Sequence, residues 1–139
     1  MPLEKFFVLP AVDFQHENIL KPGEIVTEIF VPEPKAGSKG FYHKVRERQA
    51  WDHAIVSIAT VVESSGGTVR DARVVLGGVA PIPWRAAKAE AFLRGKKLDQ
   101  AAAEKAGDIA LEGAQPLKDN GYKVGMAKAL VQRGLLASV

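Results

Sequence analysis

Cysteine is absent from this chain of 139 residues. Its absence excludes a disulfide scaffold, a thiolate metal site, a cysteine nucleophile and an iron–sulfur cluster held by the chain itself. Histidine is scarce, with only His16, His43 and His53, and their spacing matches no known pattern of metal ligands. The composition therefore predicts a protein with no metal site of its own.

Long apolar runs are missing too. No segment approaches the ~20 apolar residues of a membrane-spanning helix, and the N-terminus lacks a signal-peptide core. Lys and Arg total 19 against 16 Asp and Glu, giving a net charge of +3 with both signs mixed along the chain. A nucleic-acid-binding domain concentrates its basic residues and interleaves them with aromatics. We therefore expect a cytoplasmic protein that binds neither membrane nor nucleic acid.

Motifs of a self-contained active site are also lacking. The chain has no nucleophile elbow, no P-loop and no paired-carboxylate motif. Gly77 and Gly78 have the wrong spacing for a dinucleotide fingerprint, and prolines follow where a helix would have to begin. Asp52 and His53 are neighbours, but successive strand residues point to opposite faces. The sequence thus predicts no catalytic residue.

The apolar fraction of 47% suits one α+β domain over residues 1–139. An N-terminal arm over 1–20 precedes a small antiparallel sheet of three to four strands within 24–78, and a helical bundle fills 84–139. Alternation and turn residues predict strands over 24–31, 41–49, 54–62 and 68–76, with a hairpin turn at 64–67. Helical periodicity predicts helices over 86–93, 98–111 and 122–137.

Three local features refine this expectation. The run 54–62 is nearly continuous in apolar residues, which predicts a strand buried on both faces. Asp99 is placed to cap the second helix, and Gly95 to end the first. Phe14 and Leu20 are expected to anchor the N-terminal arm across the domain, packed on its own core. The alternative, suggested by the adjacent Phe6 and Phe7, is that the arm docks on something else.

Basic residues follow one another along the strand predicted over 41–49. Lys44, Arg46 and Arg48 fall on one face, about 7 Å apart in succession. Such a row is either a solvated face or a surface for a dinucleotide pyrophosphate, a reduced flavin or the acidic side chains of a partner. Asp52 can pair with Arg46 or Arg48, since arginine binds carboxylates through two parallel hydrogen bonds.

Five segments follow one another along the chain in this order: EKFFV, PGEIVTEIFVP, FYHKVRERQAWDHAIVS, VVLGGVAPIPWRA and GYKVGMAKALVQRGLL. Their order and spacing, more than any single segment, carry a resemblance that runs from about Phe6 to the C-terminus. The chain resembles the C-terminal domain of the FAD-binding medium subunit of molybdenum hydroxylases, the xanthine dehydrogenase and carbon monoxide dehydrogenase flavoprotein family.

The resemblance implies a lobe that closes one side of a flavin site and helps the subunit to assemble. In such enzymes a molybdopterin subunit hydroxylates the substrate, and iron–sulfur clusters pass electrons to FAD on the medium subunit. Residue-by-residue matching implies an apolar FAD contact at Val26 and a basic contact at Lys44, with the spacing between them preserved. It implies no catalytic role and no metal ligand in this chain.

The family's glycine-rich FAD-phosphate segments lie upstream of anything matched here. The resemblance therefore implies only a partial FAD contact, inside an FAD-dependent oxidoreductase complex, with no activity of the chain alone. The implied partners are the FAD-binding N-terminal lobes, the iron–sulfur subunit and the molybdopterin subunit. The alternative is a stand-alone, non-catalytic α+β interaction module, a remnant of a split flavoprotein subunit. Whether the chain is a natural short protein or a fragment stays open.

Overall fold

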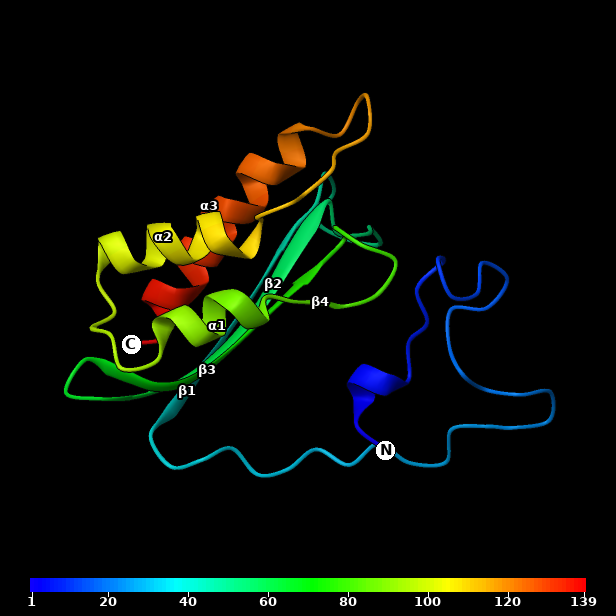
Figure 1. The fold of residues 1–139 in the computed structure, drawn as a ribbon, viewed down its shortest axis with the longest axis horizontal. Helices are drawn as coiled ribbons and strands as arrows, with labels where there is room; N and C mark the ends of the chain where they lie inside the picture. The colour runs from blue at the N-terminus through cyan, green and yellow to red at the C-terminus, as the bar shows by residue number, and fades with distance from the viewer.

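The computed structural model describes all residues, 1–139, as an antiparallel sheet covered on one face by helices (Figure 1). The sheet has the order β1-β2-β3-β4, so each strand lies beside its neighbour in sequence. The strands are β1 (Ser38–Val45), β2 (Val56–Ser65), β3 (Thr68–Gly77) and the short β4 (Trp84–Arg85). The helices are α1 (Ala87–Leu93), α2 (Gln100–Ala110) and α3 (Tyr122–Ala137), with a 3-10 helix, η1 (Leu3–Lys5), near the N-terminus. The α+β class is confirmed.

The β2–β3 hairpin forms where the turn residues predict it. Ser65 pairs with Thr68, and the two residues between them, Gly66 and Gly67, have φ values of 57° and 78°. Two successive positive φ angles define the tight turn that matches the right-handed twist of paired strands, and glycine adopts them at least cost. The predicted hairpin is thus confirmed.

The core lies between the sheet and the helices, and only one face of the sheet contributes to it. Along β2, Val56, Ile58, Thr60 and Val62 are buried, whereas the residues between them are half-buried or exposed. The prediction that this strand is buried on both faces was wrong. Its apolar run was nearly continuous because Ala59 and Val61 lie on the uncovered face.

The helices begin and end close to where the sequence predicts. The Asp99 carboxylate accepts a hydrogen bond from the N–H of Ala102 at 2.9 Å, which confirms it as the cap of α2. Helix α3 packs against β2 through Gly134, whose carbonyl accepts the Thr60 hydroxyl at 3.1 Å. The Ser138 hydroxyl is also buried and forms a hydrogen bond with the Thr60 hydroxyl at 2.8 Å. Packing of α3 on the central strand therefore depends on a small residue at 134.

Two glycines of α3 allow a matched test of that packing. A Cβ at residue 134 would lie 3.1 Å from the Thr60 methyl carbon and 3.4 Å from Phe41, whereas a Cβ at Gly125 would meet nothing within 4 Å. We expect Gly134→Ala to lower the free energy of unfolding by about 1–2 kcal/mol through overpacking. Gly125→Ala should instead raise it by up to ~1 kcal/mol, since alanine is the better helix former. Urea unfolding of both variants measures this, and a stabilised Gly134→Ala would contradict the packing.

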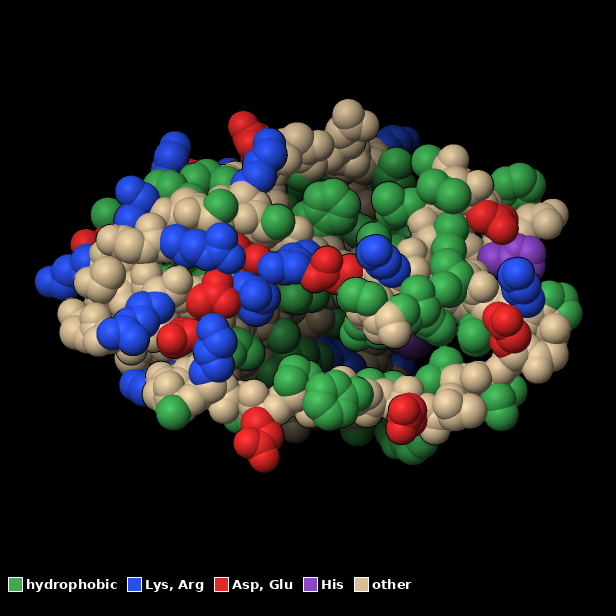
Figure 2. Space-filling model, turned by 60° about the horizontal axis from the view of Figure 1, so that its bottom comes forward, with side chains coloured by type: hydrophobic (Ala, Val, Ile, Leu, Met, Phe, Trp, Pro, Cys, Tyr) green, Lys and Arg blue, Asp and Glu red, His purple; other side chains and the backbone are tan.

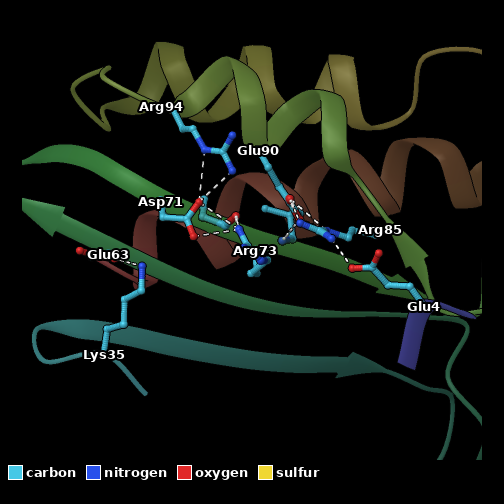
Figure 3. Close-up of polar contacts among 10 residues, drawn as sticks. Glu4, Lys35, Glu63, Asp71, Arg73, Arg85, Glu90 and Arg94 are labelled. Atoms are coloured by element: carbon cyan, nitrogen blue, oxygen red, sulfur yellow. Dashed lines mark hydrogen bonds and ion pairs between the residues drawn. The ribbon is translucent and has the colours of Figure 1, made fainter. Parts of the chain in front are cut away.

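A buried carboxylate joins α1 to the edge of the sheet (Figure 3). Glu90 is 2% exposed and accepts the N–H of Val74 at 3.0 Å. It also accepts the guanidinium of Arg85 at 2.8–3.0 Å, and this pairing holds the pKa of Arg85 above its usual value. Arg85 in turn contacts Glu4 of η1. The ion pairs thus link helix, sheet and N-terminal segment.

The N-terminal 37 residues do not join the sheet. The strand predicted over 24–31 was wrong, because these residues are extended but belong to no strand, and the sheet begins at Ser38 instead of residue 24. A β-strand exists only where a neighbour pairs with it, and no strand lies beside this segment. The expectation that the arm packs on the core was also wrong. No residue before Ser38 is buried, and Phe14 is 84% exposed.

None of the helices combines the length and the apolar character needed to cross a membrane.

Candidate functional site

Lys44 lies at the end of β1, on the face of the sheet that the helices leave uncovered. It pairs across the ladder with Ser57, which alternates with the buried Val56 and Ile58 and therefore points away from the core. Lys44 is half-buried and joins none of the nine ion pairs in the structure. Lys44 therefore lies on this face of the sheet without an acidic partner from the chain.

The residues beside Lys44 on the neighbouring strands are small. Ser57 pairs with Gly77 on the next strand, and a Cβ at residue 77 would lie only 2.5 Å from the Ser57 hydroxyl. One step further along the ladder, Tyr42 pairs with Ala59. Small residues of β2 and β3 and the exposed Tyr42 therefore lie beside Lys44 on this face.

The predicted row of three cations is broken after Lys44. β1 ends at Val45, so Arg46 and Arg48 lie in the following loop and not on the strand face. The backbone N–H of Arg48 donates to the Asp52 carboxylate at 2.9 Å, and this hydrogen bond lowers the pKa of that carboxyl. The Arg48 guanidinium lies 4.0 Å from the Asp52 carboxylate, so the two residues form a long ion pair and not the predicted pair of parallel hydrogen bonds. The predicted common face of the three cations was wrong.

The same loop presents an exposed indole. Trp51 is 96% exposed and has φ of 52°, the only positive φ outside glycine. The Arg48 guanidinium donates to its carbonyl at 3.1 Å, which stabilises the turn. A bulky residue in the left-handed region costs of order 1–3 kcal/mol and marks a position held by its surroundings. The indole therefore adds a large apolar surface next to the end of β1.

A cleft of about 340 Å³ opens on the helix side of the same end of the sheet. The loop after β3 and the loop between α2 and α3 form its walls, with Trp84, Asn120 and Lys123 among its polar and aromatic lining. Lys123 donates to the Gly78 carbonyl at 3.2 Å and so joins the two loops. The sequence analysis did not predict the cleft, because two loops separated by β4, α1 and α2 meet only in the folded chain.

Val26 lies on the extended arm, and its side chain is 51% exposed. The arm joins the sheet at the first residue of β1, while Lys44 is near the other end of that strand. Figure 1 shows the arm standing apart from the body of the domain. Neither residue lines the cleft, and the structure does not assemble them into one pocket. No group of three or more His, Asp or Glu side chains is placed to hold a metal ion.

Comparisons with known proteins assign this chain to a family. The profile described as the CO dehydrogenase flavoprotein C-terminal domain matches residues 41–138. The FAD-binding subunit PaoB of an aldehyde oxidoreductase from Escherichia coli (strain K12) is 34% identical over 126 residues, 91% of this chain and 36% of that protein. The carbon monoxide dehydrogenase medium chain of Hydrogenophaga pseudoflava is 32% identical over 142 residues, 99% of this chain and 47% of that protein.

The fold agrees with a solved structure. Carbon monoxide dehydrogenase from Hydrogenophaga pseudoflava, in a form lacking the Mo-pyranopterin moiety, superposes with a TM-score of 0.72 and 38% identity. The match covers 78% of this chain and 39% of the other. The chain belongs to the CO dehydrogenase flavoprotein C-terminal domain family. It spans less than half the length of the two sequence relatives described above.

Proposed function

We propose that this chain is the C-terminal lobe of the FAD-binding subunit of a molybdenum hydroxylase. It forms one wall of the flavin site and helps the subunit to assemble, so that electrons pass from iron–sulfur clusters to FAD. The observation that carries this proposal is Lys44, an unpaired cation on an uncovered sheet face in a chain of this family. The proposed setting is a cytoplasmic complex with an iron–sulfur subunit, a molybdopterin subunit and the FAD-binding lobes.

The residues around Lys44 fit the edge of a flavin. FAD accepts electron pairs as hydride equivalents or single electrons, and its reduced ring and its phosphates are anionic. The ammonium of Lys44 stabilises negative charge, and Ser57 and Gly77 leave the adjoining sheet surface open to a planar group. One wall does not surround a ligand or exclude water, so tight binding requires the other lobes.

Val26 is the proposed apolar contact with the same cofactor. Its side chain is half-exposed on the arm, free to pack against a flat apolar group or against the lobe that holds it. This role requires the arm to become fixed relative to Lys44. The proposal therefore couples flavin binding to the docking of the arm.

Replacing Lys44 with alanine tests the flavin contact. In the flavin-containing complex we expect Lys44→Ala to weaken FAD binding about 10-fold and to slow flavin reduction, because the negative charge loses its counter-ion. Lys44→Arg should retain most of the affinity. Lys39→Ala is the matched control, an exposed lysine at the opposite end of the same strand. Equal affinities and equal reduction rates for Lys44→Ala and wild type would refute the role of Lys44.

The exposed arm favours a second candidate, a stand-alone interaction module without a cofactor. Its apolar side chains suit a protein partner whether or not flavin is present. Purification of the tagged chain from its native cells separates the two functions. A flavin spectrum with co-purified molybdenum and iron–sulfur subunits supports the flavoprotein lobe, whereas a colourless complex with an unrelated protein supports the interaction module.

A further inference from the structure

The cleft on the helix side of the sheet takes no part in the proposed flavin wall, since neither Lys44 nor Val26 lines it. Its volume of about 340 Å³ falls within the range of small-molecule sites, ~300–1,000 Å³. Half of its lining residues are apolar, including Trp84, Leu111 and Val124. The Trp84 side chain is 43% exposed, so its flat indole can cover an apolar ligand. The cleft therefore suits a molecule with an apolar, planar body.

Lys123 provides the cleft with a cation that has no carboxylate partner in the chain. Its ammonium donates to the carbonyl of Gly78 at 3.2 Å, and it forms none of the nine ion pairs in the structure. An ammonium has three N–H donors, so two of them remain free. Because Lys123 is half-buried and lines the cleft, these donors can reach a ligand there. The bond to Gly78 also holds the side chain in place, which lowers the entropy lost when a ligand binds.

Asn120 adds a second donor, and its contacts fix which way the amide points. The side-chain oxygen accepts the N–H of Leu117 at 2.7 Å, so the NH2 group is the end that stays free. The N–H of Lys123 donates to the Asn120 carbonyl at 3.0 Å, which places both residues in one turn at the start of α3. Both residues line the cleft. Two such donors match the two oxygens of a carboxylate.

Only one acidic residue lines the cleft, and a lysine neutralises it. Glu112 pairs with Lys88 at 2.8 Å, and this contact holds the pKa of the Glu112 carboxyl below its ordinary value. The charge of Lys105 adds to the same effect. Asp119 is close to Lys123 in sequence but does not line the cleft. The charge of Lys123 is therefore left for a ligand.

Cations elsewhere on the domain lie on open surface. Figure 2 shows Lys and Arg side chains gathered on the left of the molecule, with Asp and Glu side chains among them. Close to the β2–β3 turn, for example, Asp71 pairs with Arg73 at 2.9 Å and with Arg94 at 3.0 Å. Exposed charges of this kind are screened by salt and hold a small anion only weakly. The cleft differs because its cation and its amide donor lie beside apolar walls.

We propose that this cleft binds a small organic carboxylate with a planar, apolar body. Lys123 and Asn120 hold the carboxylate, and Trp84 covers the body. The carboxylate gains a counter-ion and two donors, while burial of the planar group removes apolar surface from water. The site lies outside the proposed flavin wall and needs no flavin to form.

Naphthoate, a planar aromatic carboxylate, is the probe that tests the site, and naphthamide is its uncharged control. Titrated into the isotopically labelled chain, naphthoate should shift the NMR signals of the Asn120 side-chain amide and the Trp84 indole N–H, with a Kd below ~1 mM. Naphthamide should bind at least ~10-fold more weakly, because it brings no charge to Lys123. Signals that do not move, or equal affinities for the two probes, would overturn the carboxylate site.

Substitutions at the two polar residues test their roles. Asn120→Asp keeps the oxygen that accepts from Leu117 and replaces the free donor with a second, negatively charged oxygen, so naphthoate should bind at least ~10-fold more weakly. Lys123→Met should weaken binding by a similar factor, and Lys123→Arg should retain most of the affinity. Lys118→Met is the matched control, an exposed lysine of the same loop that does not line the cleft, and should leave the affinity unchanged. Circular dichroism checks that each variant is folded. Wild-type affinity in a folded Asn120→Asp or Lys123→Met variant would refute the assignment.

A carboxylate of this kind can belong to a free small molecule or to the C-terminus of another polypeptide. A short peptide that ends in phenylalanine carries the same chemistry at a chain terminus. Binding of this peptide at least as tight as that of naphthoate would assign the cleft to a chain terminus, and weaker binding would assign it to a free acid. Failure of the probes would leave the proposed flavin function standing, because that function rests on Lys44 at the other face of the sheet.

Discussion

Replacing Glu90 with alanine is expected to lower the free energy of unfolding by about 3 kcal/mol. The substitution leaves the buried N–H of Val74 without an acceptor and the guanidinium of Arg85 with Glu4 as its remaining partner. It also empties a volume under α1, because Glu90 is 2% exposed. Chemical denaturation followed by circular dichroism measures the loss.

A glutamate in an exposed ion pair provides the matched control. Glu112 pairs with Lys88 at 2.8 Å, and both side chains are more than half exposed. Exposed pairs contribute ~0–1 kcal/mol, so Glu112→Ala should change stability little. Glu90→Gln should lie between the two, since its amide oxygen can still accept from Val74. If Glu90→Ala and Glu112→Ala lower the free energy of unfolding equally, burial does not determine how much the Glu90 contacts contribute to stability.

Gly78→Ala is expected to lower the free energy of unfolding by a similar amount, about 3 kcal/mol, and to disturb the loop beside Lys44. Gly78 has φ of 73°, which costs a residue with a Cβ roughly 1–2 kcal/mol. The added Cβ would also lie 2.9 Å from the carbonyl oxygens of Ala54 and Ile55, which are backbone atoms with no rotamer to change. Since the Ile55 N–H donates to the Val45 carbonyl at 2.8 Å, the strain would reach the end of β1.

A substitution at Gly95 separates the cost of a positive φ from the cost of the steric contact made by the added Cβ. Its φ of 75° is nearly that of Gly78, but a Cβ there would meet nothing within 4 Å. Gly95→Ala should therefore cost only the backbone term of roughly 1–2 kcal/mol. Denaturation midpoints of the two variants, with the fluorescence of Trp51 and Trp84 as a local reporter, measure the difference. Equal losses would show that the contact with Ala54 and Ile55 imposes no strain.

Local signals in the sequence determined much of the fold because their physics is local. Two adjacent glycines can adopt the positive φ angles of a tight hairpin turn, so the β2–β3 turn at Gly66 and Gly67 was predictable. The Asp99 side chain reaches the N–H three residues later whatever the rest of the chain does, so the start of α2 was predictable as well. The family resemblance likewise rested on the order of segments along the chain.

The tertiary structure decided what depends on distant partners. The alternation of 24–31 is that of a strand, but pairing is a contact with another segment, and the chain provides no partner strand for it. The apolar run of β2 did not reveal which face the helices cover, because that is set by how α3 approaches through Gly134. Burial of Glu90 and the unpaired position of Lys44 likewise arise from elements that meet only on folding. The sequence by itself thus determined most of the elements and the family, and long-range packing decided which extended segment stays unpaired and on which face of the sheet Lys44 lies.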